Sequence, residues 1–328
     1  MKELVIRKLD ANQRVDKFVR KYLNDAPLSY IYKLFRKKDI KINGHWVKQN
    51  YILKENDNLK IYISDRELEE FNKEKIIIPT DTNLDIVYED NNILIINKPS
   101  GILVHGDKDE KRITLSNKVI NYLYKKKEYN PSSDLFIPSP CHRLDRNTSG
   151  LVIFAKNRES FNVITNLLKE HLGITKTYIA LVKGEVDIDG KIEAPLYKDD
   201  KLNKVVVKSV KEGAKPSTTL YKRIWTNKKY SLVSINLLTG RTHQIRAHFA
   251  YIEHPLIGDR KYGDFKLNNE FKKEFNYDSQ FLIALKIKFN EVIPPLDYLK
   301  NKEFNANFPK KEYKILSNLG INLIDYNI

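Results

Sequence analysis

The stretch "HRLDRNTSGLVIFAKN", residues 142–157, passes from charged residues through a turn into an apolar run. Its second half, "GLVIFAKN", is a short continuous apolar segment, which predicts a buried strand. The residues 147–150, Asn-Thr-Ser-Gly, predict a turn before that strand. The turn would lift Asp145, which stands between Arg143 and Arg146, onto a loop edge. A lone carboxylate between two arginines thus precedes a strand of the core.

Two interpretations of Asp145 follow from these residues. The carboxylate could cap the turn and pair with a neighbouring arginine, since structural ion pairs are common. Alternatively, it could be a reactive group that must stay ionised close to a polyanion. The spacing alone leaves both interpretations open.

Strand and helix signals continue outward from this stretch, between about residues 85 and 310. A hairpin is predicted around residues 90–92, and residues 158–173 predict an amphipathic helix that ends at Gly173. Further strands are predicted in "KTYIALVKGEV", "KYSLVSINLLTG" and "FLIALKIKF". Because strands outnumber crossover helices, the pattern favours an α+β domain with a largely antiparallel mixed sheet.

The N-terminal segment is basic and predicts a small separate domain. The chain carries 58 Lys and Arg against 42 Asp and Glu, a net charge of +16, and residues 1–65 supply +7 of it, with 15 basic and 8 acidic residues. Two short amphipathic helices, "QRVDKFVRKYL" and "APLSYIYKLFRKKD", are followed by short strands around Asn43-Gly44. A positive excess of this kind points to an acidic partner such as nucleic acid.

Composition excludes several classes of protein. The single cysteine cannot form an intramolecular disulfide or a cysteine-rich metal site. The apolar runs are too short to span a membrane, and the first ten residues lack the apolar core of a signal peptide. We therefore expect a cytoplasmic protein. The domains are predicted at residues 1–65, 85–310 and, as a C-terminal extension, 311–328, with a linker at 66–84.

A second cluster of chemistry-bearing residues is "LLTGRTHQIRAHFAYIEHPLIGDRKYG", residues 237–263. Thr242 is predicted to cap a helix, and Arg241 would stand just before the helix N-terminus, where an anion is favoured. Arg241 could hold a phosphate or steady the carboxylate of Asp145. The three histidines of this segment do not have the spacing of a helical zinc pair, so no metal site is predicted.

The strand "KTYIALVKG" places Tyr178 as a third candidate. The tyrosine could be an ordinary strand aromatic, or its ring could stack on a base while its phenol handles a proton.

These segments together closely resemble the signature segments of the RluA-type pseudouridine synthases, and "YEDNNILIINKPSGILVHG" resembles their opening segment. Residues 1–65 resemble an S-four-like RNA-binding domain, a usual partner in this family. The resemblance implies that Asp145 is the nucleophile, Tyr178 the active-site tyrosine and Arg241 the arginine that pairs with the carboxylate. It also implies that Arg143 helps to displace the target base.

The implied reaction is the isomerisation of uridine to pseudouridine, most often in large-subunit ribosomal RNA, by a monomer with no cofactor and no metal. Asp145 would attack C1′ of the ribose or take a proton from C2′; the sequence leaves both routes open. We predict that substrate RNA is contacted by Arg143, Lys98, His105, Arg246, Arg14, Lys17, Lys33, Arg36, Lys37 and Lys38.

Two rival functions are weighed against this one. A non-catalytic RNA-binding or ribosome-assembly protein could keep the same fold without the reaction. A uracil-base glycosylase would need a second carboxylate and a water molecule. Asp259 is a candidate for that second carboxylate.

Overall fold

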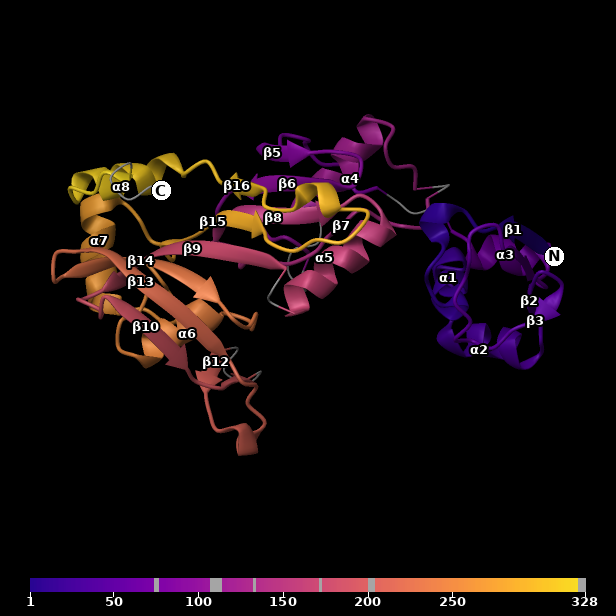
Figure 1. Ribbon diagram of the computed structural model, residues 1–328, viewed down its shortest axis with the longest axis horizontal. Helices are drawn as coiled ribbons and strands as arrows, with labels where there is room; N and C mark the ends of the chain where they lie inside the picture. The colour runs from indigo at the N-terminus through magenta and orange to yellow at the C-terminus, as the bar shows by residue number, and fades with distance from the viewer. Residues whose placement is uncertain (74–76, 107–113, 132–133, 171–172, 200–203, 324–328) are drawn as a thin grey trace.

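The computed structural model describes residues 1–73, 77–106, 114–131, 134–170, 173–199 and 204–323. Figure 1 shows a small N-terminal unit beside a much larger unit built on one long twisted sheet. Helices flank the large sheet, and most neighbouring strands in it run antiparallel. The predicted α+β class is confirmed.

The N-terminal unit folds around its two amphipathic helices. α1 buries Val15, Phe18 and Val19, while Lys17 and Arg20 on its other face stay exposed. The helices pack on a four-stranded sheet of order β1-β4-β2-β3. The elements are β1 (Lys2–Val5), η1 (Lys8–Asp10), α1 (Val15–Tyr22), α2 (Leu28–Arg36), β2 (Ile40–Ile42), β3 (His45–Trp46), β4 (Asn58–Ile61) and α3 (Asp65–Phe71).

Helix α3 lies where the sequence predicts the start of a linker. Ser64 and Glu67 form a capping box at its N-terminus. Leu68 and Phe71 then pack against the N-terminal core. On the far side of the connection, Asn121 of helix α4 (Leu115–Lys125) donates a hydrogen bond to the carbonyl of Ile78. The predicted linker of residues 66–84 is therefore largely divided between the two units.

The large sheet has ten strands in the order β10-β13-β14-β9-β15-β8-β6-β5, with β16 on β15 and β7 on β8. Its parallel pairing joins β8 to β15, which enters the sheet between β8 and β9. The strands are β5 (Ile86–Glu89), β6 (Ile93–Lys98), β7 (Ser139–Pro140), β8 (Ser149–Ala155), β9 (Ile174–Lys183), β10 (Asp189–Glu193), β13 (Thr218–Thr226), β14 (Tyr230–Leu237), β15 (Leu282–Phe289) and β16 (Glu303–Asn305). β11 (Leu196–Asp199) and β12 (Lys204–Val207) form a separate hairpin.

Strand β8 is buried along its whole length because both faces of the sheet are covered. Leu151 and Ile153 belong to one core, Val152 and Phe154 to the other, as side chains alternate along a strand. The first core lies under α5 (Arg158–Glu170), α7 (Phe265–Phe275) and α8 (Lys310–Asn318). The second lies under α4 (Leu115–Lys125) and α6 (Gln244–Tyr251). Two short 3-10 helices, η2 (Val210–Glu212) and η3 (Asp297–Leu299), complete the unit.

The C-terminal segment is part of this fold. Ile315 and Leu316 of α8, and Ile321 beyond it, are buried in the first core. The phenol of Tyr277 lies 3.0 Å from a carboxylate oxygen of the buried Glu312. The predicted extension is thus part of the large unit up to residue 323, where the described residues end. Residues 324–328 of that prediction lie outside the described residues.

Candidate active site

A pocket of about 280 Å³ opens above the start of β8. Its lining comes from the loop before β8, from β9, and from the loop that leads into α6. Asp145, Tyr178 and Arg241, the three predicted catalytic residues, all line it. Segments distant in sequence therefore meet here as the resemblance implies.

Lys98 ties the loop of Asp145 to the end of β6. Its ammonium donates hydrogen bonds of 2.9 Å to three carbonyl oxygens, those of Pro99, Ile102 and Arg146. Since an ammonium has three N–H donors, every donor is satisfied within the protein. The side chain is 0% exposed. The prediction that Lys98 contacts RNA is not supported, because the group is enclosed; it fixes the residue next to Asp145.

The turn between Asp145 and β8 depends on Gly150. Its φ of 109° lies in a region that other residues rarely adopt, and an added Cβ would lie 2.2 Å from the carbonyl oxygen of Ala284. The glycine thus permits the close approach of β15 to the start of β8. The backbone N–H of Thr148 donates to the carbonyl of Asp145, closing the predicted turn.

Arg246 is the partner of Asp145. Its Nη1 lies 2.8 Å from Asp145 Oδ2, and its Nε and Nη2 donate to the two carboxylate oxygens of Asp259 at 2.7 and 2.9 Å. The guanidinium also lies 5.1 Å from the centre of the Tyr262 ring, a cation–π arrangement. One buried guanidinium therefore joins two carboxylates, of which Asp145 alone reaches the pocket.

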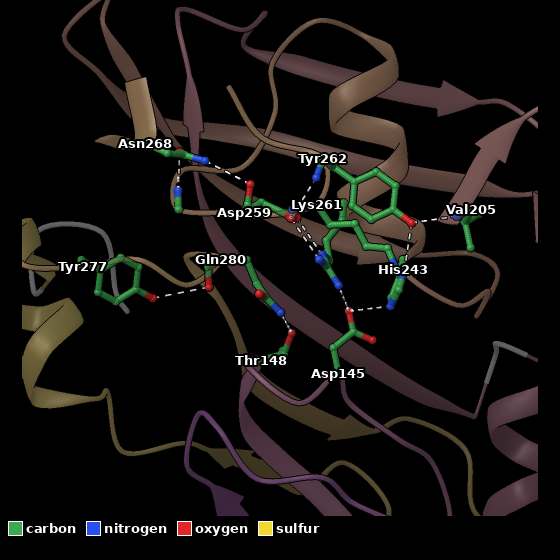
Figure 2. A network of polar contacts seen from close by, with 12 residues as sticks. Asp145, Thr148, Val205, His243, Asp259, Lys261, Tyr262, Asn268, Tyr277 and Gln280 are labelled. Carbon is green, nitrogen blue, oxygen red and sulfur yellow. Dashed lines mark hydrogen bonds and ion pairs between the residues drawn. The ribbon is translucent and has the colours of Figure 1, made fainter. Parts of the chain in front are cut away.

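Asp259 is fully buried and serves this arrangement from behind. Its Oδ1 also accepts the backbone N–H groups of Lys261 and Tyr262, at 2.8 and 3.0 Å. Burial tends to raise the pKa of Asp259, but the hydrogen bonds and charge of Arg246, with these amides, leave it below its ordinary value. Asp259 stays ionised and holds Arg246 in place; Figure 2 shows the contacts that run from Asp259 through this guanidinium to Asp145.

The structure corrects the predicted role of Arg241 as this partner. Arg241 is exposed at the pocket rim, and its Nε donates to the carbonyl of Pro216 at 3.3 Å. Its backbone N–H is held by the side chain of the buried Gln244 at 3.0 Å, which fixes the loop. The correction extends to Arg246, which was expected to bind RNA and is instead engaged by two carboxylates.

His243, rather than Thr242, occupies the N-cap position of α6. It adopts a left-handed conformation, φ 50°, ahead of Gln244. Its Nε2 lies 3.8 Å from Asp145 Oδ2 and its Nδ1 lies 2.9 Å from the hydroxyl of Tyr262, as Figure 2 shows. That hydroxyl accepts the N–H of Val205 in β12 at 2.8 Å, so its proton is free to bond Nδ1. The site is thereby linked to the β11–β12 hairpin.

The charge on His243 follows from its surroundings. Burial lowers the pKa of His243 even though Asp145 acts to raise it, and the cations Arg246 and Lys261 lower it further. A neutral imidazole that accepts at Nδ1 carries its proton on Nε2, the atom facing Asp145. Sequence analysis did not select His243; the segment's histidines were considered only as metal ligands.

Tyr178 lies on β9 with its ring in the second core and is 5% exposed. Burial, and after it the nearby charge of Asp145, raises the pKa of the phenol. The tyrosine is therefore suited to stacking and to hydrogen bonding as a neutral group.

The remaining predicted RNA contacts lie at the surface. Arg143 is exposed and lines the pocket. His105 is also exposed, and its pKa is lowered first by the partial burial of its ring and then by the charge of Arg143. In the N-terminal unit all of the predicted basic residues are exposed: Arg14, Lys17, Lys33, Arg36, Lys37 and Lys38. Arg14 is bound by Asp16 at 2.6 Å.

Exposed aromatic residues accompany these bases and were missed by the sequence analysis. Trp46 is 51% exposed beneath Lys38, whose Nζ lies 5.1 Å from its ring centre. Lys41 lies in the same way 4.9 Å from the ring of Tyr62. Aromatic residues interleaved with lysines in residues 30–62 were the available signal.

The described residues contain no cluster of three His, Cys, Asp or Glu side chains arranged to hold a metal ion. No helix within the described ranges has the length and apolar character that crossing a bilayer requires.

Comparison with known proteins identifies the family. The family model described as RNA pseudouridylate synthase matches residues 92–251. A relative from Mycoplasma capricolum subsp. capricolum, described as an RNA pseudouridine synthase, is 37% identical over 314 residues, which are 94% of this chain and 98% of the relative. This chain belongs to the RNA pseudouridine synthase family. It is accordingly an enzyme of the isomerase class.

Other members of the family are nearly as similar. Ribosomal large subunit pseudouridine synthase C of Escherichia coli (strain K12) is 34% identical, covering 85% of this chain and 86% of its own. Ribosomal large subunit pseudouridine synthase D of Buchnera aphidicola subsp. Acyrthosiphon pisum is 35% identical, with 80% coverage of each. The solved structure of human RNA pseudouridylate synthase domain containing 4 shares the fold, with a TM-score of 0.58 at 21% identity over 72% of this chain and 93% of that one.

Proposed function

We propose that this synthase isomerises uridines of large-subunit ribosomal RNA to pseudouridine, with Asp145 acting on the ribose. The reaction breaks the bond between C1′ and N1, turns the uracil and joins C5 to C1′. It is redox-neutral and moves a group within one nucleotide, so its chemistry calls for no redox cofactor.

The observation that carries the proposal is the contact between Asp145 and Arg246. The guanidinium of Arg246 lies 2.8 Å from the carboxylate of Asp145 and offsets the repulsion that this group meets beside RNA phosphates. Arg246 cannot turn away, because Asp259 binds its other edge. The carboxylate of Asp145 is thus presented to a pocket of about 280 Å³, into which the target nucleotide must be flipped.

The choice of ribosomal RNA rests on two observations. The relatives that match most of this chain include synthases C and D of the large ribosomal subunit. The N-terminal unit presents exposed bases and aromatic side chains, which suit phosphate contacts and base stacking on a large structured RNA. On this proposal the enzyme works in the cytoplasm as a monomer and isomerises uridine within the intact RNA chain.

The glycosylase alternative is disfavoured by Asp259. A glycosidase needs a second carboxyl group to protonate the leaving group or to activate water. Asp259 is 0% exposed, and its two oxygens are occupied by Arg246 and by backbone amides. It is therefore not free to take that role. A non-catalytic protein would in turn have no need for a carboxylate that an arginine holds at the wall of a pocket.

The deciding experiment maps pseudouridine in ribosomal RNA from cells with and without this gene. We expect one or more large-subunit positions to lose pseudouridine in the deletion and to regain it when the gene is restored. Purified enzyme should release tritium from RNA labelled at uracil C5 without releasing free uracil. Free uracil as the product would support the glycosylase, and unchanged pseudouridine maps would refute the ribosomal substrate.

A further inference from the structure

The pocket contains one lysine that the proposed function leaves unused. Lys176 stands two residues before Tyr178 on β9, so both side chains point to the same face of the strand. Both line the pocket with Asp145. A lysine in that position reaches the space where the detached uracil must turn.

Lys176 differs from the enzyme's other inward-facing lysines. Lys156 pairs with Glu89 at 3.0 Å, Lys118 pairs with Asp81 at 2.6 Å, and Lys98 is held by three carbonyls. For Lys176, within the ranges the structure describes, no carboxylate contributes to its electrostatic environment. Its amine is therefore not committed to a structural partner.

The surroundings of Lys176 favour the neutral amine. Burial lowers the pKa of Lys176 to about 8. Among the described side chains that line the pocket with Lys176, the one carboxylate is that of Asp145, which Arg246 binds. The other titratable side chains there are His142, Arg143, Tyr178, Arg241 and His243. The pKa of the half-buried His142 lies well below its ordinary value because of this burial and of the charge that Lys176 carries when protonated.

The reaction needs a group that can take and return a proton at the base. After C5 joins C1′, C5 still carries its hydrogen, and that proton must leave before the ring regains its double bond. Tyr178 is poorly suited to take it at neutral pH, because burial raises the pKa of its phenol and a base must be deprotonated to act. Asp145 is engaged with the ribose in the proposed function.

We propose that Lys176 carries the proton from C5 to N1 of the turned uracil; this inference rests on the proposed function. The Nζ lone pair takes the C5 proton, and the C5–H electron pair forms the C5=C6 bond. The electrons of the N1=C6 bond move to N1, which receives a proton from the Lys176 ammonium. The amine ends neutral, as it began, and no other reactant is consumed.

The test uses Lys176→Met and Lys176→Gln, with Lys183→Met as the matched control. Lys183 lies on the same strand, pairs with Asp264 and does not line the pocket. Single-turnover pseudouridine formation is measured with RNA carrying hydrogen or deuterium at uracil C5. Both Lys176 variants should be slowed by about 100-fold or more and show a C5 isotope effect larger than that of the parent. Lys183→Met should match the parent.

Chemical rescue separates proton transfer from a structural role. In Lys176→Ala, added methylamine should restore turnover in proportion to its unprotonated fraction. Slow turnover with no change in isotope effect and no rescue would overturn the inference, as would near-parental activity in the Met and Gln variants. If the parent enzyme itself forms no pseudouridine, the proposed function fails, which the same assay reports separately.

Discussion

Asp259 binds Arg246 along one whole edge of the guanidinium, through Nε and Nη2, so that Nη1 alone is directed to Asp145. The relationship fixes which arginine of the segment 241–246 contacts Asp145. It also makes the proposed nucleophile depend on a second acid, Asp259, that does not line the pocket.

Arg246→Met should therefore abolish turnover and destabilise the fold. The change leaves Asp259 buried without its counter-charge, a loss of about 3–5 kcal/mol in the free energy of unfolding. Arg241→Met, at the exposed rim, should leave stability unchanged within about 0.5 kcal/mol and mainly raise KM for RNA. Urea denaturation and single-turnover kinetics of the two variants check this. Equal losses of turnover with equal stability would contradict the assignment.

Asp145→Asn keeps the shape of the side chain and removes its charge. We expect turnover to vanish, because no other carboxylate is free in the pocket, while RNA affinity holds or rises slightly as a negative charge is removed. Tritium release from C5-labelled RNA, beside a filter-binding titration, measures both quantities. Asp278→Asn, which alters a surface ion pair with Lys272, is the control and should behave as the parent. Turnover within tenfold of the parent would remove Asp145 from the mechanism.

The rate of the C5 proton transfer should rise with pH and level off near pH 8. The sign follows because the acting form of Lys176 is the neutral amine, and burial lowers its pKa to about 8. Below that value the rate should fall about tenfold per pH unit. The pKa values of His142 and His243 are lowered from their ordinary values and that of Tyr178 is raised, so all three shift away from pH 8.

Single-turnover rates with C5-deuterated RNA between pH 6 and 9 measure this dependence. Lys98 is the group to separate from it, since burial lowers its pKa to about 7. In Lys176→Gln the rise in rate that levels off near pH 8 should be absent. A rise that persists unchanged in that variant belongs to another group and would contradict the prediction.

Tyr262→Phe should loosen the connection between His243 and the β11–β12 hairpin. The hydroxyl that this change removes accepts the N–H of Val205 and bonds His243 Nδ1. Hydrogen exchange at the Val205 amide should accelerate, and turnover should fall about tenfold, a loss of about 1.4 kcal/mol. Tyr197→Phe, on the paired strand β11, serves as control. Unchanged protection at Val205 would show that the hairpin is held by other contacts.

The basic face of the N-terminal unit should set the salt dependence of RNA binding. Replacing Lys37 and Lys38 with Gln removes two exposed cations, so the slope of log K against log salt should flatten by about 0.7–0.9 for each RNA phosphate that the protein no longer neutralises. Replacing the exposed Lys266 and Lys273 of α7 removes equal charge elsewhere and should leave the slope nearly unchanged. Equal flattening in both pairs would indicate a general charge effect.

Much of the fold was predictable from local pattern. Consecutive residues form the turn that carries Asp145 and the apolar run of β8. Of the predicted helix at residues 158–173, the structure describes α5 over residues 158–170, and the predicted hairpin at 90–92 joins β5 to β6. These features depend on neighbours in the chain, which a sequence displays directly.

The partner of Asp145 was not predictable in the same way. Arg241 and Arg246 stand five residues apart, and which one faces Asp145 depends on the left-handed turn at His243 and on Asp259, thirteen residues beyond Arg246. The enclosure of Lys98 depends on a carbonyl 48 residues away. These roles depend on contacts between residues that are far apart in the chain. The general expectation that charged residues lie at the surface predicted the opposite for Lys98 and Arg246.

The place of β15 in the sheet has a consequence for the order in which the enzyme can fold during synthesis. This strand is made after β8 and β9, yet it lies between them and brings Leu282 to the pocket wall. During synthesis, β8, which follows the loop of Asp145, and β9, which carries Tyr178, have no common neighbour in the sheet until residues 282–289 leave the ribosome. The pocket therefore cannot be complete in a partly translated chain that ends before Leu282.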